Sequence, residues 1–166
     1  MGTMKPAVHA LIAPPPLSTR EFHPSTVLVG METARAMLGM DGEEVLEQIE
    51  QGRFRWVWDI SSRPAVGGPA PGPPRLKRHR APRFWLQELQ APDLCRELTL
   101  EQVLEALLGQ GRASWPATRV AQLLLCSRPA ILRLVRAGEL TGPVRDGARL
   151  IARADLEAFL RRRLWR

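Results

Sequence analysis

The feature that most constrains this chain is an internal repeat, in which a pair of short helical patterns recurs with unchanged spacing. When the sequence is shifted by 86 residues, Ala34 aligns with Val120, and the helix break at Asp41 aligns with the break at Ser127. The apolar positions of the second helix then coincide, and a glycine follows that helix in both copies. Each pair precedes a strand pattern, a turn region, a second strand and a short helix. We therefore expect two copies of one small unit.

Local signals place the elements of each copy. Asp41 and Ser127 have the side chains preferred at helix N-caps, and Thr99 with Gln102 matches a capping box. Alternating apolar residues predict a strand over 54–60, and Asp146-Gly147 between apolar residues predicts a tight hairpin. Apolar spacing predicts helices over residues 33–51 with a break at Asp41, 84–90, 99–108, 117–124, 127–137 and 154–165.

Two proline-rich segments divide the chain. Residues 1–26 hold five of the fifteen prolines and show no period, which predicts a disordered N-terminal arm. Residues 61–74 hold five more prolines and three glycines, which predict a long loop inside the first copy. The predicted fold class is mainly α with small β-hairpins. We expect the arm over 1–26, a first unit over 27–92, a linker helix region over 93–113 and a second unit over 114–166.

Residue types that are missing exclude several functions. The chain has no tyrosine, so tyrosine recombinases, type I topoisomerases and tyrosine relaxases are excluded, since each uses a tyrosine nucleophile. The two cysteines and three histidines lack zinc-ligand spacing. No apolar run approaches the ~20 residues of a membrane helix. Two cysteines do not indicate a disulfide framework, so we expect a reducing, cytoplasmic environment. We find no nucleophile–base pair, and therefore expect a non-enzymatic chain; we expect no cofactor, metal or membrane contact.

Positive charge is concentrated in the second copy. The chain has 24 basic and 17 acidic residues, a net charge of +7, and only Lys5 and Lys77 are lysines. Residues 119–166 contain 11 arginines and 4 acids, hence a net charge of +7, whereas residues 31–60 contain 3 arginines and 7 acids, hence −4. A genome of high GC content also raises arginine usage. The guanidinium group nevertheless suits fixed contacts to phosphates and base edges, because its planar fork donates hydrogen bonds in pairs.

The tryptophans of the first copy allow two interpretations, a hydrophobic core or a platform on which bases stack. Trp56 and Trp58 share one face of the predicted strand, and Trp85 stands beside Phe84 at the start of a predicted helix. Such an arrangement favours the core, where aromatic side chains bury large apolar areas, over a stacking surface. We expect Trp115 to pack at the start of the second copy.

The second copy resembles the excisionase-type, MerR-like winged helix–turn–helix family. The resemblance rests on VAQLL before the turn, Ser127 at the cap, the amphipathic AILRLVRAGEL and the closing RLIARADLEAFLRR, and it covers Thr118–Arg163. The first copy, ARAMLGMDGEEVLEQIEQGRFRW, is similar to the same family more distantly. The resemblance implies two tandem winged helix–turn–helix units. One departure is Leu125, where the family has glycine, and it leads us to expect a slightly longer or wider turn.

In this family the second helix of the pair enters the major groove, and the wing reaches the backbone or the minor groove. The resemblance therefore implies a DNA-contacting set in the second copy, while the basic run before residue 84 suits contacts to backbone phosphates. A solvated surface is the alternative for any single arginine. The expected DNA-binding residues are Arg119, Arg128, Ala130, Arg133, Arg136, Arg145 and Arg149, with Arg75, Lys77, Arg78, Arg80 and Arg83 in the basic run.

The corresponding helix of the first copy differs in charge, since it carries Glu43, Glu44, Glu47 and Glu50. Four carboxylates pushed into a groove would be repelled by phosphates. We therefore expect this helix to contact a protein partner or to stand away from the duplex. The protein partners we consider are a recombinase, a packaging motor and a second copy of this chain.

Three functions remain. The first is a sequence-specific double-stranded DNA-binding protein, either an excisionase-like recombination directionality factor or a small transcriptional regulator of a mobile element. The second is a DNA-packaging or partition adaptor, similar to a terminase small subunit, which recruits a protein to DNA. The third is a protein-interaction module without DNA binding. The charge of the second copy favours the first two.

Overall fold

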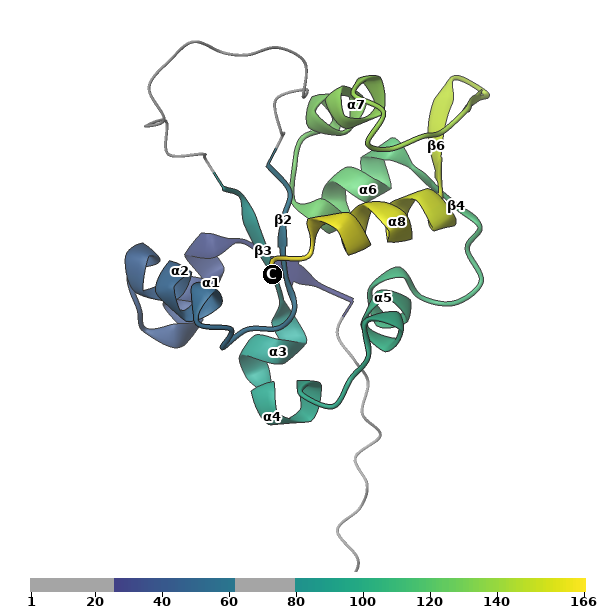
Figure 1. Cartoon of the computed structure of the whole chain (residues 1–166). Helices are drawn as coiled ribbons and strands as arrows, with labels where there is room; N and C mark the ends of the chain where they lie inside the picture. The colour runs from purple at the N-terminus through teal and green to yellow at the C-terminus, as the bar shows by residue number, and fades with distance from the viewer. Residues whose placement is uncertain (1–25, 62–79) are drawn as a thin grey trace, which may run out of the picture.

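The computed structural model describes residues 26–61 and 80–166. Within these ranges the fold is mixed α/β: about half of the residues are helical, in eight helices, and two small antiparallel sheets have three strands each (Figure 1). The expectation of a mainly α chain with hairpins missed one strand in each half. Nearly all of the predicted N-terminal arm, and most of the proline-rich loop, lie outside the described residues.

The element order repeats along the chain. The first unit contains β1 (Leu28–Val29), α1 (Met31–Leu38), α2 (Gly42–Glu50), β2 (Val57–Asp59), β3 (Pro82–Trp85) and α3 (Leu86–Gln90). Next come α4 (Pro92–Cys95) and α5 (Leu100–Leu108). The second unit contains β4 (Ser114–Pro116), α6 (Ala117–Leu124), α7 (Arg128–Arg136), β5 (Val144–Arg145), β6 (Ala148–Ala152) and α8 (Arg153–Arg163). The sheet orders are β1-β3-β2 and β4-β6-β5, so both units follow the same chain path.

The helical pairs agree residue by residue. Helices α1 and α2 begin and end 86 residues before α6 and α7, and three residues separate the helices in both pairs. The expectation of a longer turn around Leu125 is therefore wrong. Leu125 adopts the left-handed conformation with φ 52°, as Gly39 does with φ 65° at the matching position. A leucine thus holds a backbone conformation that usually requires glycine.

The predicted helix caps are present. The Asp41 carboxylate accepts hydrogen bonds from the backbone N–H groups of Glu43 and Glu44, while the Glu44 carboxylate accepts from the N–H of Asp41. Thr99 and Gln102 form a second capping box at α5. These contacts satisfy N–H groups that have no partner within the helix. They explain why the helix starts were predictable from local sequence.

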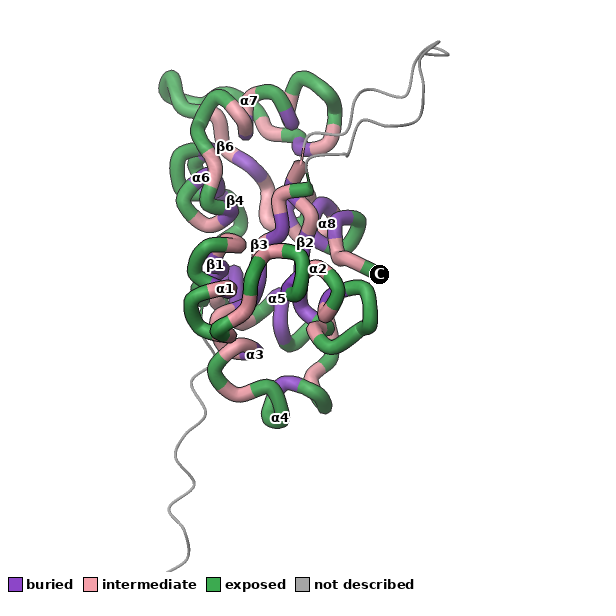
Figure 2. Tube along the Cα trace, turned by 90° about the vertical axis from the view of Figure 1, so that its left-hand side faces the viewer, coloured by how far each residue is buried: buried purple, intermediate pink, exposed green. Residues whose placement is uncertain are grey.

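The first sheet is buried on both faces. One face packs against α1 and α2 through Val29, Val57 and Phe84. The other face belongs to a larger core that continues into the second unit and into α5; its largest side chains are Trp56, Trp58 and Trp85, each at most 1% exposed. The expectation of core tryptophans is confirmed. Figure 2 shows the buried residues gathered along the strands and the inner sides of α5 and α8, with α7 at one outer end.

The two units form one packed body. Helix α5, expected as a linker, is buried at Val103, Leu104, Leu107 and Leu108. At the other end of the chain, the backbone N–H of Trp165 donates to the Val57 carbonyl, and a β-bridge joins Leu164 to Trp58. The C-terminus therefore returns to the edge of the first sheet, as Figure 1 shows.

A buried ion pair strengthens the same junction. The Arg163 guanidinium is 3% exposed and lies 2.7 Å from the Glu139 carboxylate, and it also donates to the Ser61 carbonyl at 2.6 Å. A buried guanidinium is tolerated only where its donors are satisfied. Arg163 thus connects α8 to the end of the first sheet.

Two predicted boundaries are wrong for a common reason. Phe84 and Trp85 form part of β3 instead of opening a helix, because both pair with β1 on one side and the 56–57 segment on the other. The last helix ends at Arg163, because Leu164 and Trp165 pair with β2. Tertiary pairing decides both boundaries. Among the helices described, none has the length and apolar character needed to span a bilayer.

Candidate nucleic-acid interface

Helix α7 presents an apolar side to the core and a basic side to solvent. Ser127 caps it by accepting from the N–H of Ala130, and a proline occupies its first turn. Ile131 and Leu134 are buried against α6 and the sheet. The arginines at positions 128, 133 and 136 are exposed. Arg133 and Arg136 lie opposite the buried stripe, since residues three apart share one helix face.

The outward guanidinium groups of α7 have no bonding partner in the part of the chain that the structure describes. Within residues 26–61 and 80–166, the guanidinium groups of Arg128, Arg133 and Arg136 make no hydrogen bond or ion pair. Most other arginines of the second unit bond to the protein itself: Arg153 to Glu157, Arg161 to Glu101, and Arg162 to the Glu139 carbonyl. The donors of α7 are therefore available to an external ligand.

The predicted hairpin is present beside α7. Arg145 pairs with Ala148, so Asp146 and Gly147 form a two-residue turn, both with positive φ. This is the turn geometry that Asp-Gly favours. Arg145 is exposed next to the turn, but Arg149 is half-buried and donates to the Gly142 carbonyl at 2.8 Å. Of the two arginines predicted to contact DNA from the wing, only Arg145 keeps an exposed guanidinium without a partner among the described residues.

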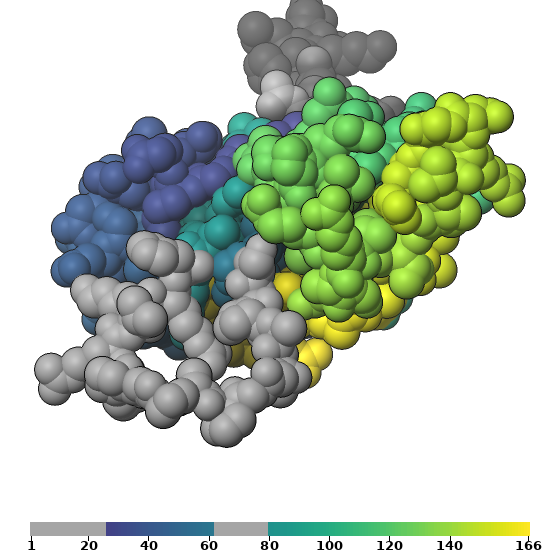
Figure 3. All heavy atoms as spheres, turned by 90° about the horizontal axis from the view of Figure 1, so that it is seen from above, coloured from purple at the N-terminus to yellow at the C-terminus, as the bar shows by residue number. Residues whose placement is uncertain are grey.

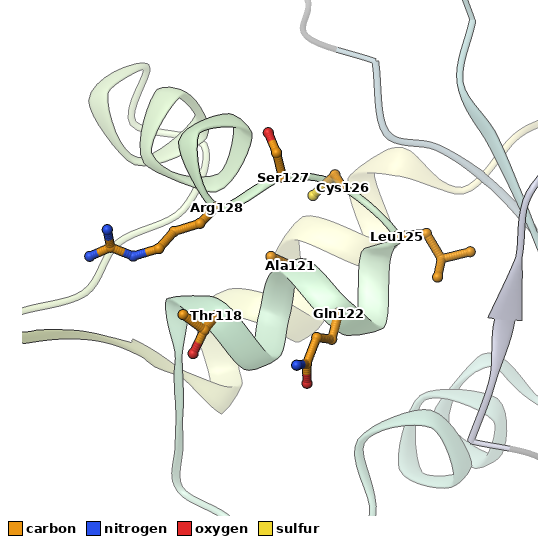
Figure 4. A pocket seen from close by; sticks show the side chains of 7 residues that line it. All are labelled: Thr118, Ala121, Gln122, Leu125, Cys126, Ser127 and Arg128. Carbon is orange, nitrogen blue, oxygen red and sulfur yellow. The ribbon is translucent and has the colours of Figure 1, made fainter.

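The helix and the hairpin occupy one face. In Figure 1 they lie together at the top of the molecule, and in Figure 3, seen from above, α7 (green) and the β5–β6 segment (yellow-green) are adjacent. A shallow hollow lies between α6 and the start of α7 (Figure 4). Its lining residues are Thr118, Ala121, Gln122, Leu125, Cys126, Ser127 and Arg128. Sequence reasoning did not single out Thr118 or Gln122, although both lie one turn apart on α6.

Three of the four acids of the second unit bond to other residues, and the fourth, Asp146, is exposed in the hairpin turn beside Arg145. Glu139 pairs with Arg163, and Glu157 pairs with Arg153 at 2.8 Å. Asp155 accepts a hydrogen bond from the Thr141 hydroxyl. Arg119, on α6, bonds to Gln122 at 3.2 Å and remains exposed. The exposed arginines of α7 and the hairpin therefore outnumber the exposed acid beside them, and the face keeps a net positive charge toward an approaching polyanion.

The basic run before residue 84 divides into two parts. Arg75, Lys77 and Arg78 lie outside the described residues. Arg80 lies 3.6 Å from the Glu50 carboxylate and stacks over Trp165 at 4.4 Å from the ring centroid.

The second described residue of the run, Arg83, is half-buried and donates to the carbonyls of Leu124 and Leu125, both at 2.8 Å. Burial lowers the pKa of the Arg83 guanidinium. Arg80 and Arg83 therefore make contacts within the protein, which the sequence did not indicate. The only hint in the sequence was Leu125 itself, which stands where the resembled family has glycine and whose carbonyl Arg83 contacts.

The outward side of α2 is acidic, as expected. Glu43, Glu44, Glu47 and Glu50 are all exposed, whereas Val45 and Ile49 are buried. Glu50 forms the pair with Arg80, and Glu47 accepts from the Gln51 amide. These four positions match Pro129, Ala130, Arg133 and Arg136 of α7, so one chain path carries opposite charges in its two copies.

Among the residues described, no three His, Cys, Asp or Glu side chains gather in a way that suits a metal ion. Cys95 is buried, which raises the pKa of its thiol to about 11, and a negative charge at Glu88 adds to the effect. Cys126 is partly exposed, and burial also raises its pKa, against the influence of Arg83 and Arg133. Comparisons with protein-family models, curated proteins and solved structures gave no match.

Proposed function

We propose that this chain binds double-stranded DNA, with α7 in the major groove and the β5–β6 hairpin on the neighbouring backbone. One observation carries the proposal: the guanidinium groups at 128, 133 and 136 of α7, and at 145 of the neighbouring hairpin, are exposed and make no hydrogen bond or ion pair with the described residues. Four exposed guanidinium groups that the fold leaves unused, against the single exposed carboxylate of Asp146 in the hairpin turn, suit a ligand of high negative charge.

The dimensions agree with such a ligand. The major groove is about 12 Å wide and admits one helix. Arg133 and Arg136 are three residues apart, which is a rise of about 4.5 Å along a helix and close to one base step of about 3.4 Å. Each guanidinium can donate two parallel hydrogen bonds to O6 and N7 of a guanine. The interface therefore favours neighbouring guanines, with Arg128 and Arg145 on phosphates.

The tandem winged helix–turn–helix interpretation belongs to the same proposal. Its support is the repeated order of strand, helix, three-residue turn, helix and two-stranded hairpin. Within it, a recombination directionality factor or a transcriptional regulator needs only duplex binding. The packaging or partition adaptor is the second candidate, and the exposed acidic side of α2 favours it, because an adaptor needs a surface for a protein partner.

The test is fluorescence anisotropy with a labelled random-sequence duplex, followed by selection of preferred sites. We expect the parent to bind with an affinity that falls as salt rises. The substitution Arg133→Ala should cost about 1–3 kcal/mol and relax the preference at one base pair. The matched control is Glu47→Ala, at the same place in α2, which should keep parental affinity. A parent that does not bind duplex at low salt, or parental affinity in the Arg133 variant, would overturn the proposal.

A further inference from the structure

The turn that aims α7 is supported by a side chain from the other unit. Arg83 stands on β3, the central strand of the first sheet, 41 residues before the carbonyl that its Nε contacts. Its Nε donates to the Leu124 carbonyl and its Nη2 to the Leu125 carbonyl, each at 2.8 Å, while Nη1 donates to the Pro82 carbonyl at 3.0 Å. One guanidinium thus binds the last residue of α6 and the next residue of the turn.

The α6–α7 turn is unfavourable by itself in two respects. The last carbonyls of a helix have no partner within it, and Leu125 holds a left-handed conformation that leucine rarely adopts. In the first unit the matching turn uses Gly39, which has no such penalty. Trp85 pairs with Leu28, and Ala152 pairs with Ser114, the residue 86 positions after Leu28. Trp85 of β3 therefore matches Ala152 of β6, and Arg83 matches Leu150, which has no guanidinium. The support is therefore one-sided, from the first unit to the second.

We infer that Arg83 is a positioning residue for DNA binding: it holds the α6–α7 turn from the first unit and thereby fixes the direction in which α7 presents its arginines. This inference rests on the proposed function for its consequence, but the support of the turn can be measured without DNA. It gives the first unit a role in recognition even though α2 is acidic. It also argues against the expected phosphate contact by Arg83, since three of its donors already bind carbonyls of the protein.

Cys126 provides a readout of the turn in the absence of DNA. It lies between Leu125 and Ser127 and is partly exposed, whereas Cys95, the other cysteine, is 0% exposed. We would measure the rate at which a disulfide reagent labels each thiol in the full chain. Local opening of the turn raises the rate at Cys126 alone, and global unfolding raises it at both.

Arg83→Gln is expected to speed the labelling of Cys126 severalfold without a change at Cys95. The loss of the Arg83 charge works in the other direction, because that charge lowers the thiol pKa, and a less acidic thiol reacts more slowly at neutral pH. A faster rate therefore reports opening. Arg80→Gln removes the same charge from the same unit without touching the turn and should leave both rates unchanged.

DNA-binding measurements on Arg83→Gln distinguish a positioning role of Arg83 from a direct contact with a phosphate. Arg83→Gln should weaken duplex binding about tenfold, as expected for loss of charge-assisted hydrogen bonds that hold the turn. The slope of log K against log salt should stay parental, whereas loss of a phosphate contact lowers it by about 0.9. Adding Leu125→Gly to Arg83→Gln should restore most of the affinity and the slow labelling of Cys126, because glycine adopts the turn conformation without help.

The outcomes are distinct. Parental labelling of Cys126 in Arg83→Gln would overturn the inference, as would a lower salt slope that Leu125→Gly does not restore. A third outcome is possible. Cys126 is labelled faster in Arg83→Gln and slowly again after Leu125→Gly is added, but the parent protein does not bind duplex DNA. This result would support the turn contact and reject the proposed DNA function.

Discussion

The two helical pairs follow the same chain path, yet they present opposite charges to their surroundings. Position 47 of α2 is glutamate where position 133 of α7 is arginine, and position 50 is glutamate where position 136 is arginine. The buried positions stay apolar in both, as at Val45 and Ile131. Packing therefore maintains the fold while the outward positions are free to diverge, and a shared fold does not imply a shared ligand.

The units also differ in how they are buried. The first sheet is covered on both faces and its outer strand β2 pairs with the C-terminal residues, whereas the hairpin of the second unit is exposed at Val144 and Arg145. The first unit thus has the character of a scaffold, and the second unit carries the open surface. The following six predictions would break or sharpen this contrast.

The largest effect is expected from charge reversal on α7. The double substitution Arg133→Glu and Arg136→Glu removes two contacts and adds two repulsive charges, so duplex affinity should fall about a thousandfold or more. Anisotropy titrations at two salt concentrations measure it, and circular dichroism verifies that the fold is retained.

The opposite change in the first unit, from glutamate to arginine at position 47, tests whether α2 also faces the duplex. Glu47→Arg makes α2 more like α7, and we expect duplex affinity to stay within about threefold of the parent, because added charge outside the interface contributes only long-range attraction. If Glu47→Arg raised affinity as strongly as the α7 reversal lowered it, both helices would face the duplex and the division of roles would be wrong.

The next effect concerns the junction between the units. Arg163→Met leaves the Glu139 carboxylate and the Ser61 carbonyl without their partner, and should lower the free energy of unfolding by about 3 kcal/mol. Arg161→Met is the control, since its pair with Glu101 is 42% and 67% exposed and an exposed ion pair contributes little to stability. Urea unfolding should show one transition in every variant. Two separate transitions in the parent would show that the units unfold independently.

Local sequence was sufficient for some parts of this molecule. The caps at Asp41, Thr99 and Ser127, the Asp-Gly hairpin and the apolar sides of the helices depend on residues within a few positions of one another. The exposure of the α7 arginines followed from the same periodicity. These features were predictable because their physical causes are short-range.

Contacts between distant residues were not predictable. Arg83 binds carbonyls 41 and 42 residues later, and Arg163 binds a carbonyl 102 residues earlier. Nothing in the composition of the basic run distinguished Arg83 from its neighbours. Strands β1 and β4 have two and three residues, too few for an alternating pattern, and they form because β3 and β6 offer an edge.

A smaller effect on stability is expected from two carboxylates that occupy matching positions in the two units, Glu88 in α3 and Asp155 in α8. Glu88 of α3 is 5% exposed and accepts from the N–H groups of Arg55 and Trp56 at 2.8 and 2.9 Å, while the matching Asp155 of α8 accepts from Thr141. Glu88→Gln should destabilise the fold by about 1–2 kcal/mol, because an amide offers one acceptor where the carboxylate offers two. Asp155→Asn, at a more exposed site, should cost less in the same urea titration.

The pH dependence follows from the same burial. Burial raises the pKa of Glu88, against the N–H groups of Arg55 and Trp56, which lower it. The folded protein then binds this proton more tightly than the unfolded chain. The contribution of Glu88 to stability is therefore largest below the ordinary glutamate range and declines as pH rises through the folded pKa. Unfolding free energies measured across that range should show this decline in the parent and not in Glu88→Gln.

The smallest effect is expected at the turns, where Gly39 and Leu125 hold the same conformation. Leu125→Gly relieves a left-handed leucine, worth about 1–2 kcal/mol, but glycine also gains freedom in the unfolded chain, about 0.5–1 kcal/mol. The net gain should be about 0.5 kcal/mol. Gly39→Leu reverses both contributions and has no residue matching Arg83 to support it, so it should cost about 1 kcal/mol. Equal and opposite changes would mean that Arg83 adds nothing to the second turn, whereas a larger loss at residue 39 than gain at residue 125 measures what that guanidinium contributes.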